Sequence, residues 1–83
     1  MNISIDRLVI DRVYTLQTKN NKWIFRFGGI KKGSIFDHGA VLLGGDVYTM
    51  DGELVDLADV VSISLPTEKA LDCFLQIEND FSR

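Results

Sequence analysis

The chain has 83 residues, a length that forms one domain and buries roughly 60 to 65 % of the surface exposed when unfolded. Apolar residues make up 46 % and charged residues 25 %, which is typical of a globular domain and excludes a disordered tail or a fibrous repeat. No stretch approaches the roughly 20 apolar residues that span a bilayer, and no basic-then-apolar leader is present. We therefore expect a cytoplasmic protein with no membrane segment.

The net charge of -3 hides a division along the chain. Residues 1–32 carry seven basic and two acidic side chains, whereas residues 33–83 carry two basic and ten acidic ones. Such a chain can attract a partner of either sign or a second copy of itself. Alternatively, strand pairing mixes the two halves into an ordinary salt-bridged surface.

The first half of the chain predicts a hairpin. Residues 1–10 indicate a short helical turn or an extended lead-in, and residues 12–19 alternate with β-branched and aromatic side chains, which predicts a strand. The Asn-Asn pair at 20–21 tolerates the left-handed backbone of a tight turn, so the chain is expected to reverse into a second strand over residues 22–27.

Aromatic side chains alternate along that second strand. Trp23, Phe25 and Phe27 share one face, where they would fill much of a small core or line a groove.

Turn signals follow at close intervals. The glycines at 28–29 indicate a bulge or bend, residues 31–34 indicate a turn, and residues 37–39 interrupt the next short strand. A second double glycine at 44–45 breaks the chain again. The Asp-Gly pair at 51–52, flanked by strand-forming residues, predicts a hairpin with a two-residue type I′ turn.

A last strand is expected over residues 60–65. Its alternation places Val61, Ile63 and Leu65 toward the core, and Pro66 ends it because proline cannot donate to a ladder.

A helix is expected over about residues 67–80, with Thr67 as its N-cap. Its apolar residues recur at helical spacing and form one stripe, which consists of Ala70, Phe74, Ile77 and Phe81. Cys73 lies near the edge of the stripe and is expected to be a small packing residue. The helix should therefore pack one face on the sheet.

These elements predict a single domain over residues 1–83 that is mainly β. We expect a small antiparallel SH3-like barrel, or a bent sheet of five to six strands, with strands within about residues 12–65 and the C-terminal helix closing one end. The alternative is a flatter meander whose exposed edge strand pairs with a second copy, giving a homo-oligomer.

Residues for catalysis are scarce, so we predict no enzyme, no cofactor and no metal site. The only histidine and the only cysteine, His38 and Cys73, are far apart in sequence, and Cys73 is expected to be buried. Asp37 and His38 are neighbours on a strand and should point to opposite faces. With Asp46 they show no recognised metal-ligand spacing.

A small anionic ligand, such as a nucleotide, is one alternative. Glycines at 28–33 flank two lysines, but the G-K-[ST] ending of a phosphate loop is absent. Arg26, Lys31 and Lys32 would then hold the anion in a pocket.

Nucleic acid offers two further alternatives. Lys22, Trp23 and neighbouring cations resemble a stacking platform for single strands, although the acidic total argues against contact with phosphates. Conversely, the acids within residues 46–59 could mimic a phosphate backbone.

Several segments together carry a family resemblance. Residues 8–14 (LVIDRVY), residues 22–27 (KWIFRF), a Lys-Lys-Gly turn and the passage through residues 66–68 into an amphipathic helix resemble small accessory proteins of bacteriophages and other mobile elements. The sequence departs from that pattern at Asp11, where glycine is expected. The resemblance implies a compact β-barrel that binds and inhibits a host or defence protein, and it transfers no functional residue.

Our leading prediction is a non-enzymatic binding module that docks on another protein, with the possibility of a symmetric oligomer. Tryptophan, tyrosine and arginine are the usual anchors of protein interfaces. The predicted contact residues are Tyr14, Trp23, Arg26 and Tyr48, to which the anionic-ligand alternative adds Lys31 and Lys32.

Overall fold

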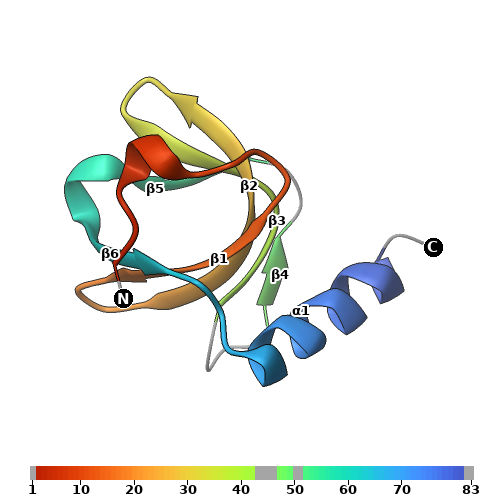
Figure 1. The fold of residues 1–83 in the computed structure, drawn as a ribbon. Coiled ribbons are helices and arrows are strands. Elements are labelled where there is room, and N and C mark those ends of the chain that lie inside the picture. The colour runs from red at the N-terminus through yellow and green to blue at the C-terminus, as the bar shows by residue number, and fades with distance from the viewer. Residues whose placement is uncertain (1, 43–46, 50–51, 82–83) are drawn as a thin grey trace.

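The computed structural model describes residues 2–42, 47–49 and 52–81. It shows a strongly bent antiparallel sheet with two 3-10 helices and one C-terminal α-helix (Figure 1), so the predicted mainly β fold class is confirmed. In chain order the elements are η1 (Ile5–Arg7), β1 (Val13–Thr18), β2 (Lys22–Lys31), β3 (Ser34–Leu42), β4 (Val47–Thr49), β5 (Gly52–Asp56), η2 (Leu57–Asp59), β6 (Val60–Ser64) and α1 (Glu68–Phe81).

The strands pair in the order β4-β3-β2-β1-β6, and β5 also pairs with β3. The first hairpin forms as predicted, with β1 and β2 in register from Val13 opposite Arg26 to Gln17 opposite Lys22. Beyond the last pair, the Thr18 N–H donates to the Asn21 carbonyl at 2.9 Å and closes the turn. The short turn predicted in residues 1–10 is η1.

The hairpin predicted at the Asp-Gly pair 51–52 is wrong. Strands β4 and β5 both run antiparallel to β3, so they run in the same direction as each other. Thr49 lies opposite Ala40 and Gly52 lies opposite Asp37, which keeps both strands on the same edge of β3. Strand β4 is therefore an antiparallel partner of β3 and not of β5. Residues 43–46, 50 and 51 lie outside the described residues.

The sheet bends where β2 and β3 fall out of step. Their register shifts twice between Phe25 and Gly29, and Gly29 has φ of 110°, a left-handed value that suits glycine. The predicted bend at 28–29 is therefore present. The predicted interruption at 37–39 is wrong, because β3 continues through it.

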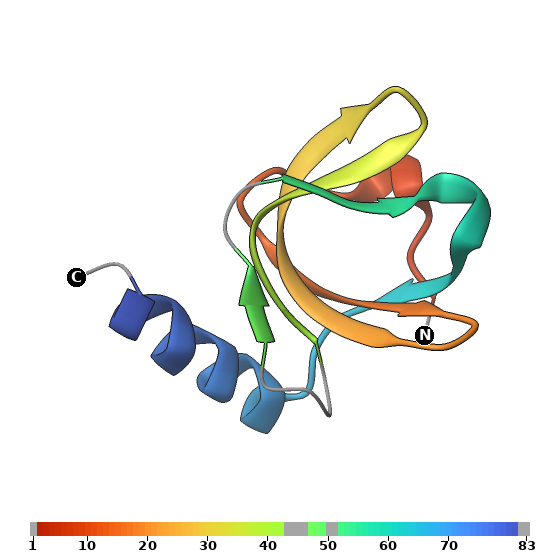
Figure 2. The same ribbon diagram turned by 180° about the vertical axis from the view of Figure 1, so that it is seen from behind.

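The sheet curls around an inner core, and Figures 1 and 2 show the curled ribbon from opposite sides. The buried residues of this core are Tyr14, Leu16, Phe25, Phe27, Ile35, Ala40 and Ile63. The rings of Tyr14, Phe25 and Phe27 lie 6.3 to 6.4 Å apart between centroids, a spacing typical of favourable aromatic pairs. The alternation predicted for β2 is thus correct for Phe25 and Phe27, while Trp23 is half-buried.

Helix α1 lies against the outer face of the sheet (Figures 1 and 2). The prediction that this helix closes one end of the curled sheet is therefore wrong. Phe74 packs there on Ile24 of β2 and Val41 of β3. The Thr67 hydroxyl accepts a hydrogen bond from the Ala70 N–H at 3.1 Å, which confirms the predicted N-cap. No helix in the described residues is long and apolar enough to cross a membrane.

Three apolar residues near the C-terminal part are placed differently from the prediction. Cys73 is exposed on α1. Only Ile63 of the last strand is in the core, whereas Val61 and Leu65 are 63 % and 70 % exposed. Val61 is the extra residue of a β-bulge, because Ser62 pairs with Gln17 while Val60 pairs with Thr18. Leu65 lies beyond the end of β6.

Candidate functional site

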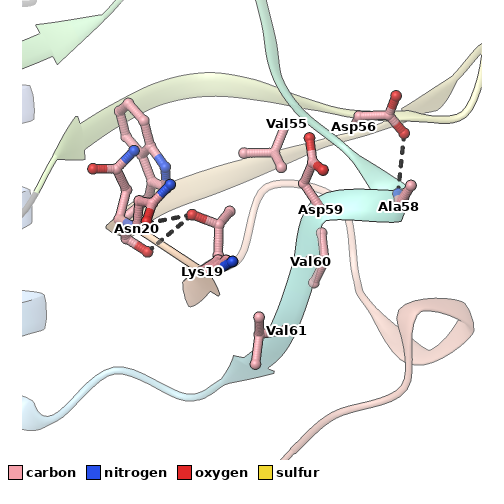
Figure 3. A pocket seen from close by; sticks show the side chains of 11 residues that line it. Lys19, Asn20, Val55, Asp56, Ala58, Asp59, Val60 and Val61 are labelled. Carbon is pink, nitrogen blue, oxygen red and sulfur yellow. Dashed lines mark hydrogen bonds between the residues drawn. The ribbon is translucent and has the colours of Figure 1, made fainter.

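A cleft of about 620 Å³ opens between the turn that joins β1 to β2 and the segment that runs from β5 through η2 into β6. Figure 3 shows Lys19 and Asn20 on one side of it and Asp59, Val60 and Val61 on the other. The cleft is lined by Thr18, Lys19, Asn20, Asn21, Trp23, Val55, Asp56, Ala58, Asp59, Val60 and Val61.

The first wall is a turn held by three hydrogen bonds. The Thr18 N–H donates to the Asn21 carbonyl at 2.9 Å, and the Asn21 N–H donates to the Thr18 hydroxyl at 3.1 Å. The Thr18 hydroxyl in turn donates to the Asn21 carbonyl at 3.3 Å. These bonds fix the shape of the turn, and Lys19 and Asn20 at its tip are exposed.

The second wall is held at η2. The Asp56 carboxylate caps η2 by accepting from the Ala58 N–H at 3.0 Å, and the Leu57 N–H donates to the Gly33 carbonyl at 2.8 Å. The bulge at Val61 then turns that side chain outward. A smaller hollow of about 260 Å³ shares Val60 and Val61 with the cleft, and these two residues line both hollows.

The apolar part of the cleft is continuous with the inner core. Trp23, Val55 and Val60 line the cleft, and all three pack against the buried residues of that core. Trp23 lies in β2 between Leu16 of β1 and Leu42 of β3, so its backbone is fixed by strands on both sides. The cleft therefore has a rigid aromatic and aliphatic interior with a polar rim.

The rim carries more negative than positive charge. Asp56 and Asp59 lie on the second wall and Lys19 on the first. None of these three forms an ion pair with any of the residues that the structure describes. Their charges are thus available to a bound molecule.

Of the predicted contact residues, Trp23 lines the cleft, whereas Tyr14 is 3 % exposed and belongs to the core. The Tyr14 hydroxyl accepts a hydrogen bond from the Val9 N–H at 2.9 Å, which satisfies the phenol inside the fold. Tyr14 therefore offers almost no surface to a partner. The side chain of Tyr48 lies outside what the structure describes.

Arg26 is engaged within the fold. Its guanidinium makes a bidentate pair with Glu78 of α1, with distances of 2.8 Å to one carboxylate oxygen and 2.7 Å to the other. The same guanidinium donates to the carbonyl of Asp11, the position where glycine was expected and where φ is 73°. Arg26 thus joins the helix, β2 and the segment before β1.

Lys31 is the last residue of β2, at the end away from Trp23, and Lys32 lies in the turn that leads to β3. The Lys31 ammonium lies 5.6 Å from the centre of the Phe36 ring, within the range of a cation–π contact. Neither lysine nor Arg26 lines either of the two hollows described above. The three cations are thus not brought together around either of these hollows.

The groups weighed for catalysis are also apart from the cleft. Asp37 is buried and His38 is exposed, as expected for neighbours on a strand, and the His38 Nε2 lies 3.8 Å from an Asp11 carboxylate oxygen. No group of three or more potential metal-ligating side chains occurs within the described ranges. The cleft contains no histidine or cysteine.

Sequence reasoning identified Trp23 but missed the second wall. The sequence pattern related the acidic residues of this wall only to mimicry of a phosphate backbone. No local pattern in the sequence predicts the bulge at Val61. The spacing between the two walls depends on the pairing of β1 with β6, which brings Thr18 beside Val60.

No protein-family model, no curated protein and no solved structure matches this chain, so the resemblance to bacteriophage accessory proteins stays a prediction.

Proposed function

We propose that this chain is a non-enzymatic binding module that holds a segment of a partner protein in the cleft between the β1–β2 turn and η2. The observation that carries the proposal is the composition of that cleft. It combines a half-buried tryptophan, the exposed side chain of Val61 and rim charges that form no ion pair with the described residues, within about 620 Å³.

The arrangement resembles the general anatomy of protein interfaces. Such interfaces have an apolar centre with aromatic anchors and a polar rim that excludes water. Trp23, Val55 and Val60 supply the centre, and Asn20 and Asp59 belong to the rim. A partner segment with an apolar side chain next to a lysine or arginine would match both parts.

The walls of the cleft are already formed before a partner arrives. The hydrogen bonds of Thr18 with Asn21 and of Asp56 with Ala58 hold the two turns in place. Preformed walls reduce the conformational entropy that binding must overcome, and this favours affinity for a short segment.

A small anionic ligand and nucleic acid have less support. Arg26, which the ligand alternative requires, is paired with Glu78, and the cleft carries two carboxylates against one ammonium. Phosphate groups would be repelled by such a rim.

Selection from a random peptide display library tests the proposal. The wild type and Val61→Asp are both used as immobilised targets, and Leu65→Asp is the matched control because Leu65 is as exposed as Val61 but lies outside the cleft. We expect peptides that bind the wild type and Leu65→Asp and bind Val61→Asp at least tenfold more weakly, a difference of about 1.4 kcal/mol.

The selected peptides should also change the fluorescence of Trp23, the only tryptophan of the chain, on titration. Failure to enrich any peptide, or equal binding to all three targets, would contradict the proposal.

A further inference from the structure

The chain itself carries a segment with the chemistry that the cleft would accept. At the tip of the β2–β3 hairpin, Ile30 is 41 % exposed and is followed by two exposed lysines, Lys31 and Lys32. The tip therefore presents an apolar side chain beside two positive charges. The rim of the cleft presents Asp56 and Asp59.

The tip is rigid. Ile30 pairs with Ile35 and Lys31 pairs with Ser34, which leaves a two-residue turn. Lys32 and Gly33 have φ values of 51° and 75°, both positive, as a type I′ turn requires. A lysine is disfavoured in this backbone conformation, yet here it places a cation at the end of the hairpin.

The tip and the cleft lie side by side but do not engage each other within one molecule. The Gly33 carbonyl accepts from the Leu57 N–H at 2.8 Å, and Ser34 pairs with Asp56. Nevertheless, neither lysine forms an ion pair with any residue in the described part of the chain, and no residue of the tip lines the cleft. Both surfaces remain available to another molecule.

We propose that the cleft binds the β2–β3 tip of a second copy of this chain, and that two copies exchange tips in a closed dimer. The inference rests on the proposed function, because it uses the same cleft. The tip and the second wall of the cleft, which carries Asp56 and Asp59, both adjoin η2 on one side of each molecule. A two-fold axis beside them would therefore place each tip against the cleft of the other copy. Such an arrangement closes the assembly at two copies. Opposite charges on the two surfaces favour this contact.

Charge-reversal substitutions in the tip and in the cleft test the dimer. Its dissociation constant is measured by sedimentation equilibrium between about 10 µM and 1 mM protein. Lys32→Asp reverses the charge of the tip and retains a residue type that type I′ turns accept, and Asp59→Lys reverses the charge of the cleft. The matched controls are Lys69→Asp and Asp72→Lys, which change the same charges at exposed positions of α1.

We expect a wild-type dimer whose dissociation constant rises about tenfold with either reversal, because each dimer contains two such contacts. The chain that carries both reversals should recover most of the wild-type affinity, and the two controls should leave it unchanged. About 0.5 M NaCl should weaken the dimer.

Two outcomes overturn the inference: a wild type that stays monomeric up to about 1 mM, or a dimer that neither reversal weakens. If peptides selected against the cleft still bind such a monomer, the proposed function stands while the self-docking fails. If no peptide binds either, both proposals fail together.

Discussion

The two faces of the sheet are covered in different ways. The inner face has seven buried residues within the described ranges, from β1, β2, β3 and β6, and three of them are aromatic rings in mutual contact. Among the residues that the structure describes, the outer face has three buried ones, Ile24, Val41 and Phe74, of which Phe74 comes from α1. Within the described residues, the strands thus share many buried contacts, whereas α1 contributes one fully buried ring, with Ala70 and Ile77 partly buried beside it.

An ion pair supplements that ring. Arg26 and Glu78, with side chains 25 % and 21 % exposed, join the outer face to the second half of α1. The pair is bidentate, which makes it stronger than an ordinary surface salt bridge. The difference between the faces indicates that the helix can be released without unfolding the bent sheet, and three substitutions test this.

The largest effect is expected from Phe25→Ala on the inner face. Phe25 has no exposed surface, and removing a buried phenylalanine side chain costs about 3 to 5 kcal/mol, a large fraction of the stability of a small domain. Urea unfolding followed by Trp23 fluorescence should show the loss. Leu65→Ala, at an exposed site, should change stability by less than about 0.5 kcal/mol. Similar losses for both variants would contradict the assigned core.

Phe74→Ala on the outer face should have a smaller effect on the stability of the sheet. The local loss is expected to reach about 3 kcal/mol, but much of it should appear as undocking of α1 and not as global unfolding. Hydrogen exchange should accelerate in residues 68–81 while β1 and β2 stay protected. Equal acceleration in the strands would show that the two faces unfold as one unit.

The smallest effect is expected from Glu78→Gln, which removes the charge of the carboxylate that Arg26 contacts. Because both side chains are partly exposed, we expect a loss of about 1 kcal/mol, seen as faster exchange in α1 alone and reduced by about 0.5 M NaCl. Asp80→Asn, on an exposed part of the same helix, serves as the control. A loss of stability equal to that of the control would show that the ion pair of Arg26 with Glu78 does not stabilise the docked helix.

The local elements could be predicted from the sequence where the local residue pattern agrees with the strand pairing in the folded sheet. The Asn-Asn turn, the alternating Phe25 and Phe27 and the Thr67 cap depend on neighbours within a few residues, and all three were correct. The Asp-Gly pair gave an equally strong local signal, yet β3 is long enough to pair with both β4 and β5. Tertiary pairing overrode turn propensity there.

The candidate site could be predicted only in part. Trp23 stood out as an aromatic residue on an alternating strand, but its position in a cleft depends on residues 55–61, which are distant in the chain. Tyr14 shows the opposite error, because composition alone does not distinguish a core tyrosine from an interface tyrosine. The bulge that exposes Val61 arises from the register of β1 with β6 and has no signature in the sequence.

The placement of β6 and α1 has a consequence for biosynthesis. Ile63 completes the inner core and Phe74 completes the outer one, so neither core closes until the ribosome has translated this part of the chain. Until then the nascent hairpin of β1 and β2 has Phe25 and Ile24 on opposite faces without their final cover. Molecular chaperones would therefore meet an apolar surface on both sides of that hairpin during translation, and Ile24 and Phe25 would be buried once β6 and α1 have packed.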